Sequence, residues 1–205
     1  MGIPVLILGK SGSGKSCSMR NFNPDEVGIF NVAGKPLPFR KKLKKVDNAT
    51  YSRIVKGLTE PKLKKYVIDD SQYLMAFEMF NKVNEKGYQK FTDIAVNFYG
   101  LIQFIINNTP PDVIVYFLHH TQETDYGIKA KTVGKMLDDQ LTVEGLFSIV
   151  IMAVCQAGEY KFITHTDGTN TVKTPFEMFE SDSIENDLKA VDETIRNYYE
   201  MEVKK

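Results

Sequence analysis

Short apolar runs alternate with amphipathic segments along most of this chain. Apolar runs bounded by glycine or polar residues predict buried strands at residues 3–8, 27–32, 66–68, 113–118, 147–155 and 160–164. Apolar residues at helical spacing predict helices at 15–22, 50–58, 73–80, 92–105 and about 184–199. The last two strands are expected to form a hairpin through residues 156–159. Strands that alternate with helices are typical of a layered α/β fold with a mostly parallel central sheet.

Two of the predicted helices have an informative pattern. Thr92 is expected to cap the most regular helix, whose apolar stripe is Ile94, Phe98, Leu101, Ile102 and Ile105. The preceding helix carries an aromatic stripe of Tyr73, Leu74, Phe77 and Phe80. We expect this stripe to pack in the core rather than to form a platform for stacking bases. The polar segment 84–91, between the two helices, is expected to be a loop.

Length and composition fit one globular domain over residues 1–205. Of the 205 residues, 42% are hydrophobic and 25% are charged, which suits a folded chain with a substantial core. No apolar run approaches the roughly 20 residues that a membrane-spanning helix needs, and the first ten residues lack a secretion signal. Cys17, at a helix start, and Cys155, in an expected buried strand, suit a reducing compartment. A cytoplasmic protein is therefore predicted.

The formal net charge is zero, but the charges are unevenly distributed. Residues 35–65 contain eleven Lys or Arg against two acidic residues, whereas residues 177–202 contain nine acidic residues against two basic ones. Two solvated faces are the simpler interpretation. The alternative is a basic patch that faces a polyanion, with an acidic helix near 184–199 that shields it or meets a neighbouring subunit.

A glycine-rich turn directly after the first strand matches the phosphate-loop pattern G-x-x-x-x-G-K-[ST] at every fixed position. Its residues are Gly9, Lys10, Ser11, Gly12, Ser13, Gly14, Lys15 and Ser16, and Cys17 follows at the helix start. Backbone N–H groups of such a turn surround phosphate oxygens, and the helix N-terminus favours negative charge. Lys15 is expected to contact the terminal phosphates of ATP, and the Ser16 hydroxyl is expected to bind Mg²⁺.

An acidic pair ends the third predicted strand, as in a Walker B element. Asp69 is expected to hold the Mg²⁺, and Asp70 is expected to orient or deprotonate the attacking water. The next strand ends in polar residues 119–122. Among them His120 and Gln122 are the favoured catalytic sensors, against an interpretation in which the histidines only cap and pack the strand end.

The chain resembles small phage-encoded RecA-like ATPases that accompany single-strand annealing and recombination. The likeness rests on the following blocks: GKSGSGKS at 9–16, NVAGKPLPFRKK at 31–42, YVIDDSQYL at 66–74, KGYQKFTDIAVNF at 86–98 and KAKTVGKML at 129–137. The resemblance implies a three-layer P-loop NTPase fold with a RecA-like core, in which the strand ending at residue 118 is inserted between the two motif strands. It also implies a homo-oligomeric ring or filament that couples ATP to single-stranded DNA handling in the host cytoplasm.

The chain departs from the RecA pattern in two respects. Asn31 ends the second predicted strand, where RecA carries a catalytic glutamate, so Asp70 or another group must act as the base. Arginine is scarce, with four in the chain. Lys129, Lys131 and Lys135 therefore have three possible roles: they contact single-stranded DNA, they act as a finger across a subunit boundary, or they lie in a solvated loop.

Three functions remain open from the sequence. The leading prediction is an ATPase that acts in single-stranded DNA recombination. A nucleotide-gated interaction module with negligible turnover is the second, because the glutamate is absent. A small-molecule phosphotransferase is disfavoured, because such enzymes neutralise the moving phosphoryl group with clustered arginines.

Overall fold

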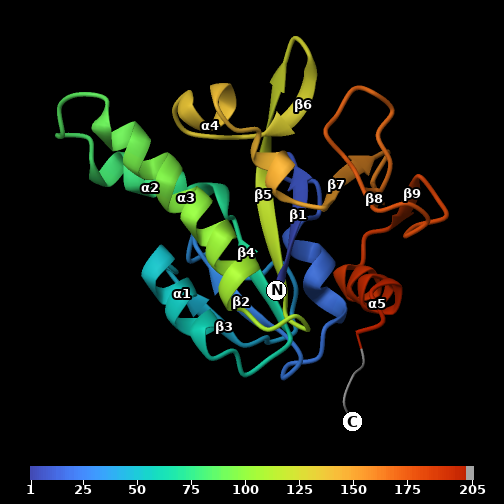
Figure 1. Cartoon of the computed structure of the whole chain (residues 1–205). Helices are drawn as coiled ribbons and strands as arrows, with labels where there is room; N and C mark the ends of the chain where they lie inside the picture. The colour runs from blue at the N-terminus through green and yellow to red at the C-terminus, as the bar shows by residue number, and fades with distance from the viewer. Residues whose placement is uncertain (202–205) are drawn as a thin grey trace.

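The computed structural model describes residues 1–201, in which strands and helices alternate as the pattern predicts (Figure 1). The strands are β1 (Ile3–Gly9), β2 (Gly28–Asn31), β3 (Lys45–Asp47), β4 (Lys65–Asp69), β5 (Ile114–Thr124), β6 (Gly127–Ala130), β7 (Ile149–Gln156), β8 (Glu159–Ile163) and β9 (Ser183–Glu185). The α-helices are α1 (Tyr51–Thr59), α2 (Gln72–Asn81), α3 (Gln89–Asn108), α4 (Met136–Asp139) and α5 (Leu188–Tyr198), and the 3₁₀ helices are η1 (Ser16–Asn21) and η2 (Val143–Leu146).

Within the described residues, all strands belong to one sheet with the order β3-β2-β4-β5-β1-β7-β8-β9, and β6 pairs with β5. The six neighbouring strands β3, β2, β4, β5, β1 and β7 run parallel to one another. Strands β6, β8 and β9 pair antiparallel with their neighbours. β5 lies between β1 and β4, so the strand inserted between the two motif strands is confirmed. The predicted mixed α/β fold with a mostly parallel sheet is confirmed as well.

Two apolar cores cover the two faces of the sheet. Helices α1, α2 and α3 pack over one face, and η1 and α5 pack over the other. The central strands are buried on both sides because their side chains alternate between these cores: Leu6 and Leu8 of β1 belong to the first, and Val5 and Ile7 to the second. A layer of helices on each side therefore surrounds a sheet whose carboxyl ends converge at one edge.

The predicted hairpin and the most regular helix are confirmed. β7 and β8 pair antiparallel through a turn at residues 157–158, and the predicted stripe of α3 is buried. The predicted cap of this helix is wrong. α3 begins at Gln89, so Thr92 lies within its first turn, and the N-cap residue Tyr88 makes no side-chain cap. The expected loop is correspondingly shorter.

The start predicted for the C-terminal helix is also wrong. Ile184 pairs with Phe162 in the edge strand β9, and α5 begins four residues later at Leu188. Asp187 caps the helix, because its side chain accepts a hydrogen bond from the backbone N–H of Lys189. A single apolar residue at helical spacing could not distinguish a short edge strand from a first helical turn.

Two burial predictions fail. Leu74 is buried, but Phe77 is 43% exposed and Phe80 is 72% exposed, so the aromatic stripe of α2 leaves the core after its first turn. The α2–α3 pair extends beyond the sheet at this point, which leaves these rings without a layer to cover them (Figure 1). Cys155 lies in β7 as expected, but it is exposed because the β7–β8 hairpin extends past the neighbouring strand β1.

Besides β9, the sequence pattern fails to predict two other short strands. β3 lies inside the basic segment 35–65 and forms one edge of the sheet. β6 turns the expected polar loop after the sensor strand into a hairpin, in which Lys129 is a strand residue. Polar composition hid both strands, because edge strands need not bury their side chains.

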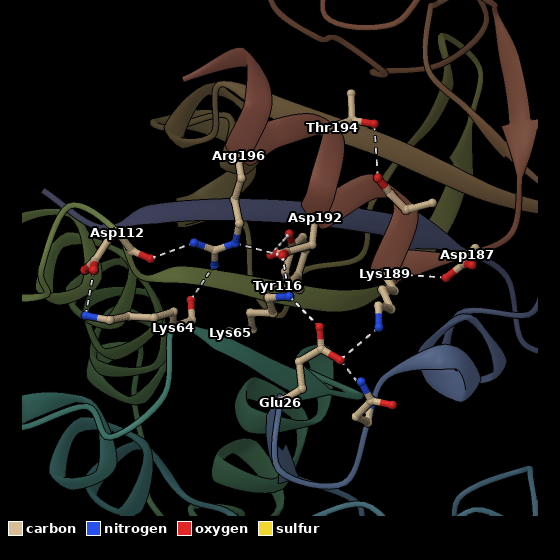
Figure 2. Close-up of polar contacts among 12 residues, drawn as sticks. Glu26, Lys64, Lys65, Asp112, Tyr116, Asp187, Lys189, Asp192, Thr194 and Arg196 are labelled. Carbon is tan, nitrogen blue, oxygen red and sulfur yellow. Dashed lines mark hydrogen bonds and ion pairs between the residues drawn. The ribbon is translucent and has the colours of Figure 1, made fainter. Parts of the chain in front are cut away.

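A network of charged side chains fixes α5 to the amino ends of β4 and β5 (Figure 2). Fully buried Asp192 accepts hydrogen bonds from the Tyr116 hydroxyl at 2.8 Å and from Arg196 Nε at 2.8 Å, and its carboxylate lies 3.0 Å from Lys65 Nζ. Lys65 Nζ also donates to Glu26 at 2.7 Å. The guanidinium of Arg196 donates further to the backbone carbonyls of Lys64 and Asp112. Each charge is therefore matched by an opposite charge or by a backbone group.

Across residues 1–201, no helix combines the length and the apolar character that crossing a bilayer requires.

Candidate functional site

The turn between β1 and η1 lies at the carboxyl edge of the sheet. It follows β1, which lies between β5 and β7 in the sheet. Gly12 and Gly14 adopt φ values of 79° and 90°, which favour glycine. The hydroxyl of Ser13 is buried and has no hydrogen-bond partner among the described residues. An unpaired buried hydroxyl costs free energy unless a partner satisfies it, so Ser13 Oγ can accept a hydrogen bond from, or donate one to, a polar group that enters the turn.

Lys15 is folded back over this turn. Its side chain is 6% exposed, and Nζ donates hydrogen bonds to the carbonyl oxygens of Gly9 at 2.7 Å and of Lys10 at 2.9 Å. Burial lowers the pKa of Lys15 to about 8, although the carboxylates of Asp70 and Asp69 oppose the change. The ammonium group is therefore held in a place that lacks a full counter-charge, and a bound anion would supply one.

The two predicted metal ligands contact each other although they lie on different elements. Ser16, at the start of η1, donates a hydrogen bond from Oγ to Oδ1 of Asp69, at the end of β4, over 2.8 Å. Burial raises the pKa of Asp69 to about 6, assisted by the neighbouring Asp70 carboxylate and opposed by the bond from Ser16 and by Lys15. A hydroxyl and a carboxylate are ligands suited to Mg²⁺, which keeps most of its waters and accepts few protein groups. The two residues therefore fit a Mg²⁺ ion.

Asp70 adopts φ 59°, which is unusual for a residue other than glycine. One oxygen of its carboxylate accepts a hydrogen bond from Lys35 Nζ at 2.9 Å, and the other lies 3.2 Å from His120 Nε2. Burial raises the pKa of Asp70, but the bonds from His120 and Lys35 outweigh it and hold the pKa below its ordinary value. The structure thus brings Asp70 and His120 together, as the sequence predicts for two groups at neighbouring strand ends.

The two histidines of β5 point to different surroundings. His119 is fully buried, where Nδ1 lies 2.9 Å from Ser71 Oγ and Nε2 lies 2.9 Å from the carbonyl oxygen of Lys131. Burial lowers the pKa of His119 to about 4, so this ring is neutral and structural. His120 faces the pocket because successive strand residues point to opposite sides.

Gln122 is not brought to the pocket. It lies in the part of β5 that extends beyond β1 and pairs with Lys129 of β6. The residues that line the cavity around Lys15, which has a volume of about 280 Å³, do not include Gln122. Within the described residues, its position gives no contact that supports a sensor role.

The three candidate lysines lie in different places: Lys129 belongs to β6, whereas Lys131 and Lys135 follow that strand. Lys129 lies 3.2 Å from Asp138 and forms an ion pair with it, whereas Lys131 and Lys135 are exposed. The backbone of Lys131 instead pairs with β5, since its N–H donates to the His120 carbonyl oxygen at 2.9 Å. Among the described residues 1–201, Lys131 and Lys135 form no ion pair.

Lys35 and Tyr160 are site residues that the sequence analysis missed. Gly34, at φ 68°, turns the chain after β2 so that Lys35 reaches Asp70, with its ammonium also 5.0 Å from the ring centre of Tyr73. Tyr160 of β8 lines the same cavity and packs against Gly14, where an added Cβ would lie 2.7 Å from the ring. The glycine before Lys35 was a usable signal for the turn, whereas Tyr160 is placed by strand pairing alone.

Asn31 is accounted for by the same loop. Its buried side chain donates to the Lys35 carbonyl oxygen at 2.6 Å and to the Asp47 carboxylate at 2.6 Å. Asn31 therefore positions the segment carrying Lys35.

A larger cavity of about 720 Å³ lies on the other side of residues 10–13, and Lys15, Asp69 and Asp70 do not line it. The charged groups thus converge on the smaller cavity. No family model matches this chain, and no curated protein matches it.

Proposed function

We propose that this chain binds Mg·ATP in the turn at residues 9–16 and hydrolyses it slowly, on a P-loop fold with a RecA-like core. The observation that carries the proposal is the 2.8 Å hydrogen bond between Ser16 Oγ and Asp69 Oδ1. It joins the two sequence elements that a magnesium nucleotide needs, and β5 lies between their strands, as in RecA-like ATPases.

Binding is proposed because the Lys15 ammonium lacks a full counter-charge and the Ser13 hydroxyl lacks a hydrogen-bond partner among the described residues. Phosphate oxygens at the turn would replace the two carbonyl contacts of Lys15 and would supply the counter-charge that burial denies it. The unpaired Ser13 hydroxyl would gain an acceptor. Ser16 and Asp69 would hold Mg²⁺, which when bound neutralises phosphate charge.

The hydrolytic step depends on Asp70. Its carboxylate is ionised at neutral pH and can accept a hydrogen bond from water, with His120 fixing its orientation. Lys35 places a positive charge 2.9 Å from the same carboxylate. This lysine would stabilise developing negative charge in the role that arginine usually fills, but it also makes Asp70 a weaker base. Slow turnover is the expected result.

Titration calorimetry with Mg·ATP tests binding. Lys15→Ala is expected to weaken affinity by about 100-fold, because a charge-assisted contact to phosphate is lost. Lys44→Ala is the matched control, since this exposed side chain pairs with Asp25 away from the turn and should leave affinity unchanged. Wild-type protein that shows no heat with Mg·ATP would contradict the proposal.

A nucleotide-gated module with negligible turnover is the second candidate, favoured by the pairing of Asp70 with Lys35. Phosphate release by wild type and by Asp70→Asn separates the two functions. Hydrolysis that falls at least about tenfold in Asp70→Asn, with binding retained, supports an ATPase. Equal, near-background release by both proteins supports gating.

The finer proposal, coupling to single-stranded DNA in a phage-type recombination system of the host cytoplasm, rests on the resemblance described above. Exposed Lys131 and Lys135 support a contact to a nucleic-acid backbone. Fluorescence anisotropy of a labelled oligonucleotide at low salt tests it with and without Mg·ATP. Binding that Lys131→Glu/Lys135→Glu abolishes supports the loop contact, and absence of binding by wild type contradicts the DNA role.

A further inference from the structure

A groove with a basic rim lies at the β3 edge of the sheet, beside α1. Its volume is about 760 Å³, and Val46, Leu63 and Tyr66 form part of an apolar floor. The rim carries Lys44, Lys45, Arg53, Lys56 and Lys62, and Glu60 is the single acidic residue among the lining groups. We call this surface the basic groove.

The rim charges are only partly neutralised within the chain. Lys44 pairs with Asp25, and Lys45 pairs with Asp47. Arg53, Lys56 and Lys62 form no ion pair in residues 1–201. Three cations that form no ion pair in the described residues therefore border an apolar hollow, with Glu60 as the one acidic group beside them.

A second exposed surface has the opposite charge. Phe176 is 83% exposed, and its carbonyl oxygen accepts a hydrogen bond from the Tyr198 hydroxyl at 3.0 Å. Tyr199 lies edge-on to Tyr198, with ring centres 5.1 Å apart. The exposed acids Glu177 and Glu200 follow Phe176 and Tyr199 in the chain. We call this cluster the acidic aromatic patch.

The two surfaces lie over opposite faces of the sheet. The groove adjoins α1, which packs on one core, whereas the patch is built on α5, which packs on the other (Figure 1). A basic rim around an apolar floor complements exposed rings flanked by carboxylates. Exposed apolar clusters rimmed by polar groups mark interaction surfaces.

We infer that the basic groove of one molecule receives the acidic aromatic patch of a second copy of this chain. Because the two surfaces lie on opposite faces, the contact joins different surfaces of two copies and continues from molecule to molecule as a ring or filament. Segregated charges on a chain of zero net charge favour such association. The inference concerns surfaces away from the phosphate turn and does not depend on nucleotide binding.

A nucleic-acid backbone is the less favoured occupant of the groove. It would satisfy the rim cations but would place phosphates over an apolar floor. The largest aromatic rings of that floor are also inaccessible for stacking bases, since Tyr66 is 6% exposed and Phe30 is 5% exposed. The patch satisfies both the charge and the apolar surface.

Sedimentation velocity over a concentration series, without nucleotide, is the first measurement. Wild type is expected to form oligomers that dissociate as salt is raised. Lys56→Glu/Lys62→Glu in the groove and Glu177→Lys/Glu200→Lys in the patch are each expected to weaken association at least about tenfold, because like charges then face each other. Lys86→Glu/Lys90→Glu changes as much charge outside both surfaces and should associate like wild type.

Mixing the two reversed variants is the decisive experiment. Each variant alone opposes like charges at every contact, whereas the mixture pairs an acidic groove with a basic patch and a basic groove with an acidic patch. Association is expected to return in the mixture. Phe176→Ala, which changes no charge, is expected to weaken wild-type association as well.

Three outcomes would overturn the inference: a wild-type monomer at every concentration, association that the groove variant does not alter, and a mixture that stays monomeric. Circular dichroism of each variant shows whether it is folded. Oligonucleotide binding that only the groove variant loses, while self-association persists, would assign the groove to nucleic acid instead. Nucleotide affinity, measured separately, reports on the phosphate turn and not on this interface.

Discussion

The two ends of the parallel sheet both gather charged residues, but the pKa values of Lys15 and Asp69 at the carboxyl edge shift in the opposite sense to those of the amino-edge network, whereas Asp70 at the carboxyl edge is paired like that network. At the carboxyl edge, burial lowers the pKa of Lys15 to about 8 and raises the pKa of Asp69 to about 6, so the fold disfavours their charged forms. At the amino edge, hydrogen bonds outweigh burial: the pKa of Glu26 falls to about 2, and the pKa of Lys65 rises. The charged forms are favoured there.

Under the proposed function, the difference separates a binding site from a structural clamp. Charges that lack partners store a cost that a ligand of opposite charge can relieve, which is how sites are prepared for binding. Charges that are fully paired and hydrogen-bonded fix one element against another. Each of the following changes is expected to affect one end and not the other.

Asp192→Ala at the amino edge is expected to have the largest effect. It leaves buried Arg196, Lys65 and the Tyr116 hydroxyl without their shared partner, and uncompensated buried charge costs about 3–5 kcal/mol of unfolding free energy. Urea unfolding measures it. Exposed Glu193→Ala, the neighbouring control, should change the free energy by less than about 0.5 kcal/mol. A loss under about 1 kcal/mol for Asp192→Ala would show that the Asp192 network does not hold α5 against the sheet.

Lowering the pH should reduce the unfolding free energy by protonating Glu26 at the same edge. Its folded pKa of about 2 lies below the ordinary 4.5, so its contribution is fully present above pH 4.5 and is lost as the pH falls toward 2. Allowing for partial solvent screening, the contribution is about 2 kcal/mol. Unfolding free energies of wild type and Glu26→Gln between pH 2 and pH 7 measure it, with the variant flatter in this window. Parallel curves would count against the proposed pairing.

Lys15→Met at the carboxyl edge should change the unfolding free energy in the opposite direction, that is, it should stabilise the fold. The folded pKa of about 8 lies below 10.5, so charging Lys15 carries a cost that is fully present below pH 8 and disappears above 10.5. Removing the charge should raise the unfolding free energy at pH 7 by about 1 kcal/mol while Mg·ATP binding is lost. Thermal unfolding and calorimetry measure the two effects, with Lys44→Met, an exposed lysine outside the turn, as control. A destabilised variant would show that Lys15 is a structural residue.

Lys35→Ala should have the smallest effect on stability. Its side chain is 60% exposed, and such ion pairs contribute less than about 1 kcal/mol. Its loss is nevertheless expected to raise the pKa of Asp70, because one of the two hydrogen bonds that lower it disappears. Carboxyl-carbon NMR titration of Asp70 measures this shift. An unchanged pKa would indicate that His120 alone controls this carboxylate.

Local patterns allowed much of the site to be predicted. The phosphate turn, its two acidic residues and His120 depend on strands that run in parallel and end at the same edge, so their spacing in sequence predicts their meeting in space. Long-range contacts explain what was missed. Lys35 reaches Asp70 because Gly34 turns its loop, and Tyr160 reaches Gly14 because β8 returns beside β7.

By itself, the sequence determined the layered α/β class, the succession of its main strands along the chain and the glycine-rich turn at residues 9–16, because apolar periodicity and glycine spacing are local properties. Tertiary structure decided which charges are paired, which aromatic rings are left exposed and where short edge strands form. Those features depend on what lies across the sheet or beyond its edge, and neighbours distant in sequence, such as Glu26, Lys65 and Asp192, leave no local pattern.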